Sequence, residues 1–577
     1  MKRRNFIESL TLASGIFAAP PMFANRLSQD AHEKTIRSQA SDTISVDLII
    51  AGGGLGGCAA ALAALRNGLT VVMTEETDWI GGQLTQQGVP PDEHPWIESH
   101  GATELYRTLR KGIREYYRQH YPLRDQVAAD PHFNPGGASV SRLAHEPRVA
   151  LAVLEALFAP YVSSGKLLLL KEYRAISADT RGNKILALQV RSPKTGTTKT
   201  LKGHYFVDAT ELGDLLPMTE TAYVTGAESR PQTGELHAAD AHEPENNQSF
   251  THCFAIDYAK GEDWTIPRPD QYSFWRGYKP DLDPPWPGKL LELNYSNPRT
   301  LQPKALGFHP EGNAMGDILN LWNYRRIIDK NNFAPETYQS DITIVNYPQN
   351  DYFFGNIVDV SPKALETHFE NGRQLSLSLL YWLQTEAPRP DGGRGWPGLR
   401  LRGDIMGTEG GDGLAKYPYI RESRRIKALF TVKEQHVGKE QRAKITGLQG
   451  DELVAETFDD SVGIGYYHID LHPSSGGDNY IDFGSLPFQI PLGALIPRKM
   501  ENLFPANKNI GTTHLTNGCY RLHPVEWSIG EAVGMLVPFL MEKGIAPQQA
   551  YKDRALIQEF QKLVRQQGIE TEWPAQN

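Results

Sequence analysis

Two apolar runs flank a glycine-rich turn and a small-residue helix close to the start of the chain. Residues 46–50 have the uninterrupted apolar character of a strand that is buried on both faces, and residues 59–65 continue as an alanine-rich helix. Residues 69–74 form the second apolar run. This order predicts a β-α-β unit with parallel strands at the beginning of an α/β domain.

Hydrophobic spacing predicts further elements along the chain. Apolar residues at helical intervals indicate packing helices over residues 101–121 and 146–162, and residues 166–190 are typical of a strand hairpin with a Gly-Asn turn. In the middle of the chain, the expected elements are helices near 315–330, 362–386 and 423–436, and strands within 341–347 and 463–471. Proline- and glycine-rich turns separate them.

Composition narrows the class of protein. The chain has 577 residues, which is long enough for two or more domains around a large core. Its formal net charge of -9 comes without a long basic run, which argues against nucleic acid and anionic membrane surfaces as partners. Cys58, Cys253 and Cys519 are far apart and do not have the spacing of a zinc ribbon, a dithiol motif or a disulfide scaffold, although a single bridge stays open.

The first residues have the pattern of an export signal. Residues 1–24 combine a basic start, a modest apolar stretch and small residues before a plausible cleavage point. The pair Arg3 and Arg4, followed by two apolar residues, favours a twin-arginine signal, with an ordinary secretory signal as the alternative. We therefore expect the twin-arginine export machinery as a partner, a periplasmic location, residues 25–43 as a linker, and no stable membrane insertion.

The glycine turn has the spacing of a dinucleotide-binding fingerprint. Gly52, Gly54 and Gly57 spell G-x-G-x-x-G between the first strand and the helix. In this fingerprint the first glycine permits the tight turn, the second lets a pyrophosphate approach the backbone, and the third lets helix and strand pack closely. Glu75 ends the second strand, where a carboxylate can accept hydrogen bonds from ribose hydroxyls. Both FAD and NAD satisfy this pattern, and a ligand-free glycine turn is the alternative.

A second glycine pair favours FAD. Gly81, Gly82, Gln83 and Leu84 closely follow Glu75 and resemble the glycine pair of glutathione-reductase-like flavoproteins, in which a backbone turn runs beside the flavin ring and the ribityl chain. The alternative is an ordinary glycine loop. The resemblance implies that these residues contact FAD.

Two later segments extend the resemblance over most of the chain. Residues 208–214, DATELGD, resemble the D-A-T-G-x-G-D segment of the FAD-dependent oxidoreductase family, and residues 506–534 resemble its final block, with WNYRRI, DITIVNYPQNDY and YIRESRRI similar to a bacterial exported branch. Glu211 departs from the glycine of that pattern, and Asn507 and Glu531 depart from its commonest residues. The resemblance assigns to the cofactor Asp208, Ala209, Thr210, Asn507, Ile510, Gly530 and Glu531.

The resemblance implies a fold class and a domain organisation. The fold is α/β, with a discontinuous Rossmann-like FAD-binding domain of the glutathione-reductase type and an inserted mixed α+β substrate domain. Residues 44–227 and 491–545 would form the FAD-binding domain, residues 228–490 the substrate or cap domain, and residues 546–577 a C-terminal helical tail. A helix beginning at Gly530 would point its free N–H groups at the flavin, where negative charge accumulates on reduction.

The final block also contains groups suited to oxidising a C–H bond, which requires a base and a cation. His523 and His514 are the candidate bases, Arg521 is the candidate anion clamp, and Asn517 is a candidate orienting residue. Each also has a structural interpretation, because loop histidines commonly serve only as hydrogen-bonding partners and the arginine can bind the cofactor instead.

Three polar motifs lie in the middle of the chain: WNYRR at 322–326, NYPQND at 346–351 and YHIDLH at 467–472. Aromatic rings interleaved with Asn, Asp and Arg could stack on a sugar ring while the polar groups bind its hydroxyls. The alternative for the tryptophans between residues 264 and 396 is a domain core. The last motif has no matching ligand set elsewhere, so we expect no metal site.

Together these patterns predict an FAD-dependent oxidoreductase, a dehydrogenase or oxidase, that moves a hydride from a small polar substrate to flavin N5. Carbohydrate derivatives are among the candidate substrates. No second strand-glycine-helix unit for a nicotinamide cofactor is evident, so electrons would leave to oxygen, a quinone or a redox protein. The alternatives are a flavin-bearing lyase or isomerase acting on glycans and a non-catalytic FAD-containing glycan-binding protein.

Overall fold

The computed structural model describes residues 36, 42–313 and 315–574, so the predicted signal at 1–24 and nearly all of the predicted linker at 25–43 lie outside the described residues. Its largest sheet has the strand order β3-β2-β1-β6-β5-β4, with β21 also paired to β6. These strands are β1 (Thr43–Ala51), β2 (Val71–Glu75), β3 (Leu167–Lys171), β4 (Arg174–Arg181), β5 (Lys184–Arg191), β6 (Thr198–Asp208) and β21 (Leu503–Pro505).

Parallel pairing dominates this sheet. β1, β2, β3, β6 and β21 pair in parallel, whereas β4 and β5 add an antiparallel hairpin. β6 is shared, because its first half pairs with β5 while Phe206–Asp208 pair with Leu503–Pro505. A strand from the last part of the chain thus completes a sheet that begins at residue 43.

The predicted β-α-β unit is confirmed by β1, α2 (Leu55–Arg66) and β2. The expected hairpin over 166–190 is only partly right. β3 is a parallel strand beside β2, and the hairpin consists of β4 and β5. The uninterrupted apolar run of β3 explains the difference, because such runs belong to strands buried between two layers.

Apolar residues cover both faces of the parallel sheet. Leu48 and Ile50 of β1 belong to the core cluster that contains α2, whereas Ile49 and Ala51 belong to a cluster on the opposite face. Adjacent side chains of a strand point to opposite faces, so this division follows the alternation of β1.

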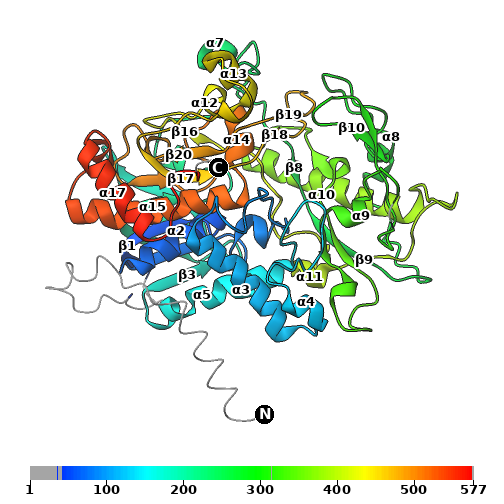
Figure 1. Ribbon diagram of the computed structural model, residues 1–577. Coiled ribbons are helices and arrows are strands. Elements are labelled where there is room, and N and C mark those ends of the chain that lie inside the picture. Colours follow the sequence, from blue (N-terminus) through cyan, green and yellow to red (C-terminus); the bar gives the residue numbers. More distant parts are fainter. Residues whose placement is uncertain (1–35, 37–41, 314, 575–577) are drawn as a thin grey trace.

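Two helices distant in sequence pack closely beside the sheet (Figure 1). α15 spans His523–Lys543, so the predicted helix start at Gly530 is wrong and Gly530 lies inside the helix. A Cβ atom at Gly530 would lie 2.0 Å from the carbonyl oxygen of Gly56, and one at Gly534 would lie 2.3 Å from that of Ala60. Gly534 lies about one helical turn after Gly530, and Ala60 lies about one turn after Gly56. Because both steps go in the same direction along the chain, α2 and α15 run parallel and begin at the same end of the sheet.

Most of residues 250–401 form small sheets and helices around a second apolar cluster, on the side of the molecule that Figure 1 shows in green, whereas the strands between residues 461 and 491 pack on the core cluster that contains α2. The strands of the middle of the chain are β7 (Tyr223–Val224), β8 (Phe250–Thr251), β9 (Phe254–Tyr258), β10 (Asn294–Ser296), β11 (Pro303–Ala305), β12 (Arg326–Ile328), β13 (Ile342–Val345), β14 (Asp351–Tyr352), β15 (Leu399–Leu401), β16 (Arg425–Ile426), β17 (Ser461–Gly465), β18 (Ile469–Leu471), β19 (Ile481–Phe483) and β20 (Phe488–Pro491).

The other helices vary widely in length. They are α3 (Glu104–His120), α4 (Asp125–Ala129), α5 (Pro147–Ser163), α6 (Leu215–Met218), α7 (Arg230–Thr233), α8 (Tyr272–Gly277), α9 (Leu321–Tyr324), α10 (Pro362–Thr385), α11 (Gly403–Met406), α12 (Glu434–Val437), α13 (Lys439–Thr446), α14 (His514–Tyr520), α16 (Pro547–Ala550) and α17 (Arg554–Gln566). Among the described residues, none of the helices combines the length and apolar character that crossing a bilayer requires.

Several sequence predictions in this region are confirmed and others are wrong. α10 matches the helix expected at 362–386, but 315–330 contains only the short α9 followed by β12, and 423–436 begins with β16. Tertiary pairing with β13 and β7 overrides helical periodicity in these two segments. Five of the six tryptophans between 264 and 396 are buried, which favours the core interpretation, and Trp264 is 45% exposed.

The contact between α2 and α15 leads to a stability prediction. Gly530→Ala should destabilise the protein by about 1–3 kcal/mol, because the added methyl group meets backbone that cannot give way. Urea unfolding followed by tryptophan fluorescence measures the effect. Gly277→Ala is the matched control, because its Cβ would have nothing within 4 Å. Equal unfolding midpoints for Gly530→Ala and the unmodified protein would contradict the close-packing assignment.

Candidate functional site

An open pocket of about 440 Å³ lies where β1 and β6 end. It is lined by Gly52, Gly54, Thr74, Glu75, Glu76, Gln86, Tyr173, Arg174, Ala175, Ala209, Thr210, Glu211, Asp214 and Tyr417. Gly52 has φ +97°, and a Cβ there would lie 2.1 Å from the carbonyl oxygen of Ala209. The predicted glycine turn therefore passes directly against the end of β6, in a conformation that favours glycine.

Two buried carboxylates hold the walls of this pocket. Glu75 accepts hydrogen bonds from the backbone N–H groups of Gly53 and Thr77, at 3.0 and 2.8 Å. Burial raises the pKa of Glu75 to about 8, although these hydrogen bonds oppose the shift. Asp208 accepts from the Thr210 backbone and hydroxyl at 3.1 and 2.7 Å, and therefore shapes the loop after β6.

The second glycine pair lies against the first turn. The Gly81 N–H donates to the Gly53 carbonyl at 2.7 Å, and a Cβ at Gly82 would lie 2.9 Å from the Leu55 nitrogen. Gln83 Nε2 donates to the Arg521 carbonyl at 2.9 Å, whereas Gln83 Oε1 is buried without a hydrogen-bond partner in the described part of the chain. The loop thus connects the glycine turn to the last block. Leu84 is buried in the core.

The cofactor residues assigned to the final block lie in different places. Asn507 Nδ2 donates to the Ala209 carbonyl at 2.7 Å, beside Gly54 and Gly56, and Ile510 is buried in the core. Gly530 packs on α2, and Glu531 accepts a hydrogen bond from Trp527 Nε1 at 3.0 Å. Neither Gly530 nor Glu531 lines the pocket, because α15 begins well before them.

Sequence reasoning missed a buried charged group at the glycine turn. Lys508 Nζ lies 2.5 Å from Glu211 Oε2 and 3.7 Å from Glu526 Oε2, and its side chain is 1% exposed. Glu526 Oε1 in turn accepts from the Gly56 N–H at 3.4 Å, near the start of α2. Burial raises the pKa of Glu526, and the ammonium group of Lys508 opposes this rise. The sequence signal for this buried charged group was Glu211, which stands where the family pattern has glycine.

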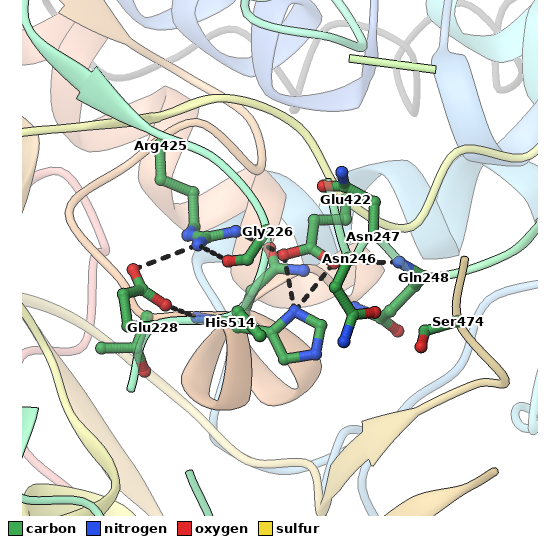
Figure 2. A network of polar contacts seen from close by, with 12 residues as sticks. Gly226, Glu228, Asn246, Asn247, Gln248, Glu422, Arg425, Ser474 and His514 are labelled. Atoms are coloured by element: carbon green, nitrogen blue, oxygen red, sulfur yellow. Dashed lines mark hydrogen bonds and ion pairs between the residues drawn. The ribbon is translucent and has the colours of Figure 1, made fainter. Parts of the chain in front are cut away.

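His514 belongs to a buried ionic network rather than to the glycine turn (Figure 2). His514 Nδ1 lies 2.8 Å from Glu422 Oε1, and Glu422 also contacts Arg425. Burial alone would lower the pKa of His514, but its attraction to Glu422 and their hydrogen bond raise it. Asn517 Nδ2 donates to the Arg421 carbonyl at 2.9 Å. His514 also lines a separate cavity with Glu228 and other residues.

Arg521 lies in the turn between α14 and α15, and His523 is the first residue of α15. His523 Nδ1 accepts from the Asp92 N–H at 3.1 Å, and its Nε2 lies 3.3 Å from the Val89 carbonyl. Burial lowers the pKa of His523 to about 3, so the ring is neutral at physiological pH. Arg521 Nη1 donates to the Tyr419 hydroxyl at 2.6 Å, and Nη2 lies 3.3 Å from Asp470 Oδ2.

Residues from all three central motifs gather near Arg521. Three arginine-aspartate pairs form there, with N···O distances of 3.1 Å for Arg325–Asp92, 3.0 Å for Arg421–Asp351 and 3.3 Å for Arg521–Asp470. We call these six residues, together with Tyr419, Asn346 and His472, the Tyr419 cluster. The guanidinium carbons of Arg421 and Arg521 lie 4.7 and 5.9 Å from the Tyr419 ring centre.

A carboxylate-histidine pair lies within this cluster. Asp351 Oδ2 is 2.6 Å from His472 Nδ1, while Asp351 Oδ1 accepts from Thr251 Oγ1 at 2.6 Å. Burial would raise the pKa of Asp351, but Arg421 and His472 lower it. Asp351 is therefore held as a carboxylate that orients the imidazole ring of His472.

His468, Asp470 and Asp482 bring their ligand atoms within 4.8 Å of one another. Arg521 and Arg299 pair with the two aspartates, at 3.3 and 3.5 Å. The two aspartates are close because β18 pairs with β19 in a register that places Asp470 opposite Asp482, and each carboxylate has its own arginine partner.

Comparison with known proteins identifies one family. The sequence matches the family model described as FAD dependent oxidoreductase over residues 47–564. No curated protein matches the chain. Among solved structures it is similar to L-proline dehydrogenase from P. horikoshii, at 18% identity over 35% of this chain and 26% of that chain, with a TM-score of 0.16.

A second solved structure with a likeness is glycerol-3-phosphate dehydrogenase from Bacillus halodurans complexed with FAD. Its identity is 15% over 37% of this chain and 40% of that chain, and the TM-score is 0.21. The chain covers less than half of the length of both structures.

The His514 network leads to a pH prediction. Because the pKa of His514 is raised on folding, the stability it contributes is present below its unfolded pKa and is lost as the pH rises through its folded pKa. His514→Gln should therefore lower the melting temperature more at about pH 6 than at about pH 9. Replacement of the exposed His204 by Gln is the control. A deficit that grows toward high pH would contradict the assignment.

Proposed function

Because the chain belongs to the FAD-dependent oxidoreductase family, we propose that it oxidises a small polar substrate by hydride transfer from a C–H bond to N5 of FAD. The observation that carries this proposal is the hydrogen bond from Gln83 to the Arg521 carbonyl. It joins the loop of the expected flavin site to the buried polar groups around Tyr419. A cofactor site and a substrate site would then be neighbours.

The residues around the glycine turn fit FAD. The pocket beside Gly52 and Gly54 has Glu75 in its wall, where a carboxylate can bind ribose hydroxyls. Buried polar atoms of Gln83, Glu211 and Asn507 have no hydrogen-bond partner within the described residues, which suits a polar group among them. We propose that these residues, with the start of α2, hold the nucleotide and ribityl parts.

Lys508 would add positive charge at the same place. Its ammonium group is buried beside the start of α2, whose free N–H groups also favour an anion. The two carboxylates next to it, Glu211 and Glu526, neutralise this charge in the absence of a phosphate group. Lys508 would be the residue that offsets the negative charge of the pyrophosphate.

On the substrate side, Arg521 is the proposed anion clamp, as its guanidinium group lies against Tyr419 and Asp470. His523 can accept a proton only on Nδ1, and only when the Asp92 N–H releases that atom. His514 keeps Nδ1 on Glu422. Both histidines stay candidate bases, and Asn517 stays a candidate orienting residue through its bond to the Arg421 carbonyl.

We also propose a cellular setting and an architecture. The arginine pair near the start supports export through the twin-arginine machinery to the periplasm. The electron acceptor would be oxygen, a quinone or a redox protein. The return of β21 to β6 supports a discontinuous FAD-binding domain of the glutathione-reductase type, and the apolar cluster between residues 212 and 480 supports an inserted substrate domain.

Anaerobic mixing tests the function. Purified holoprotein should be yellow, release FAD on denaturation, and lose its flavin absorbance when mixed without oxygen with its substrate from a panel of sugars, polyols, amines and hydroxy acids. Bleaching without an added acceptor identifies an electron donor. A coloured protein that no compound bleaches would contradict substrate oxidation, and turnover of a glycan without bleaching would favour the lyase or isomerase alternative.

Glu75→Ala tests the ribose contact. At about pH 9, where Glu75 is ionised, we expect FAD retention to weaken by about 1.5–3 kcal/mol, the range for hydrogen bonds to a charged group. Dialysis followed by absorbance of the retained flavin measures the loss. Glu155→Ala is the control, because Glu155 pairs with Lys171 on the surface. Unchanged retention in Glu75→Ala would remove this residue from the cofactor site.

A further inference from the structure

We propose that the Tyr419 cluster is a binding site for the carboxylate of a hydroxy-acid substrate, sugar acids included. This inference rests on the proposed function, because it names the substrate class of the same site. It goes further by distinguishing acids from neutral sugars and polyols. The residues that carry it are Arg325, Arg421, Arg521 and Asn346.

The first observation is a set of buried donors without partners. The Nε atoms of Arg325, Arg421 and Arg521 have no hydrogen-bond partner among the described residues, and neither has Nδ2 of Asn346. Each of these four residues is less than a tenth exposed. Buried donors in proteins are nearly always satisfied by protein, water or ligand, so four of them in one cluster indicate a missing acceptor.

These four residues lie close to one another. Arg421 and Arg521 both contact Tyr419, and Arg421 Nη2 lies 3.4 Å from Asn346 Oδ1. The pair Arg325–Asp92 lies close to Arg521 as well. The Asp92 N–H donates to His523, and His523 is the first residue of α15, two positions after Arg521. Segments around residues 92, 325, 346, 421 and 521 thus converge on one tyrosine ring.

The chemistry of the unpaired atoms selects the ligand. In Arg325, Arg421, Arg521 and Asn346, every unpaired atom is a donor. A sugar hydroxyl both donates and accepts, so it needs acceptors as well as donors from its site. A carboxylate only accepts, through two oxygens that suit the planar donors of arginine. The three aspartates of the cluster are already paired with arginines, so an acceptor-only group matches the remaining four donors better than a neutral polyol.

The cluster is also next to the cofactor loop. Gln83, which belongs to the second glycine pair, donates to the carbonyl of Arg521. His472 lies in the same cluster, with its Nδ1 held by Asp351 and its Nε2 3.7 Å from Asp470. The hydroxyl-bearing carbon of an acid bound there would lie among the same segments that contact the loop of the expected flavin site.

Matched acid and neutral compounds test the proposal on the holoprotein. The probes are gluconate with sorbitol, glucuronate with glucose, and lactate with 1,2-propanediol. Binding is measured from perturbation of the oxidised flavin spectrum and, separately, from the rise in melting temperature. We expect at least one acid to bind about 10-fold or more tightly than its neutral partner, as an extra hydrogen bond to a charged group implies.

Asn346→Asp is the informative variant, because it replaces an unpaired donor by an acceptor of the same shape. Acid binding should weaken about 10-fold or more, while the neutral compounds change little. Asn346→Ala serves as a second variant, and flavin content reports whether either variant folds. Asn183→Asp adds the same charge on the exposed turn between β4 and β5 and should leave acid binding unchanged.

Two outcomes would overturn the proposal. One is that the neutral compounds bind as tightly as their acid partners, or that no acid perturbs the holoprotein by either readout. The other is that Asn346→Asp and Asn346→Ala both retain acid binding. Failure of the proposed function looks different, because the purified protein then carries no FAD or its flavin is never bleached, whereas acid binding is scored without turnover.

Discussion

The backbone contact between α2 and α15 is the constraint on which the rest of the site depends. Where Gly530 meets Gly56, and Gly534 meets Ala60, any larger side chain would separate the helices. The parallel packing places the start of α15 beside the start of α2, and Glu526 consequently reaches the Gly56 N–H. Chain segments more than 400 residues apart thereby share one end of the sheet.

Buried ion pairs hold the surrounding segments in place around the contact between α2 and α15. Lys508 joins Glu211 to Glu526, Arg425 joins Glu228 to Glu422, and Arg521 reaches Asp470. Each pair links parts of the chain that are distant in sequence or separated by a turn. Removing one partner of a buried pair leaves an uncompensated charge, at a cost of about 3–5 kcal/mol. The polar interior therefore contributes, together with the apolar core, to specifying which loops meet.

The sequence predictions that the structure confirms depended on local patterns. The strand, glycine turn and helix near residue 50 follow from short-range periodicity and from the steric need for glycine at Gly52. The start of α15 was missed because that helix is buried on all sides and shows no amphipathic edge, although Pro524 in its first turn was a signal. Pairs such as Lys508–Glu211 and Arg421–Asn346 depend on tertiary contacts that no local pattern encodes.

The sharing of β6 between β5 and β21 affects how the chain matures on the ribosome. Phe206, Val207 and Asp208 emerge long before their partners Leu503, Phe504 and Pro505 are translated. Until then a half-strand edge stays open, with free backbone groups that invite pairing with another nascent chain. A cofactor site that needs β21 is therefore complete only after nearly the whole polypeptide has been made, and until then the open edge exposes the nascent chain to aggregation.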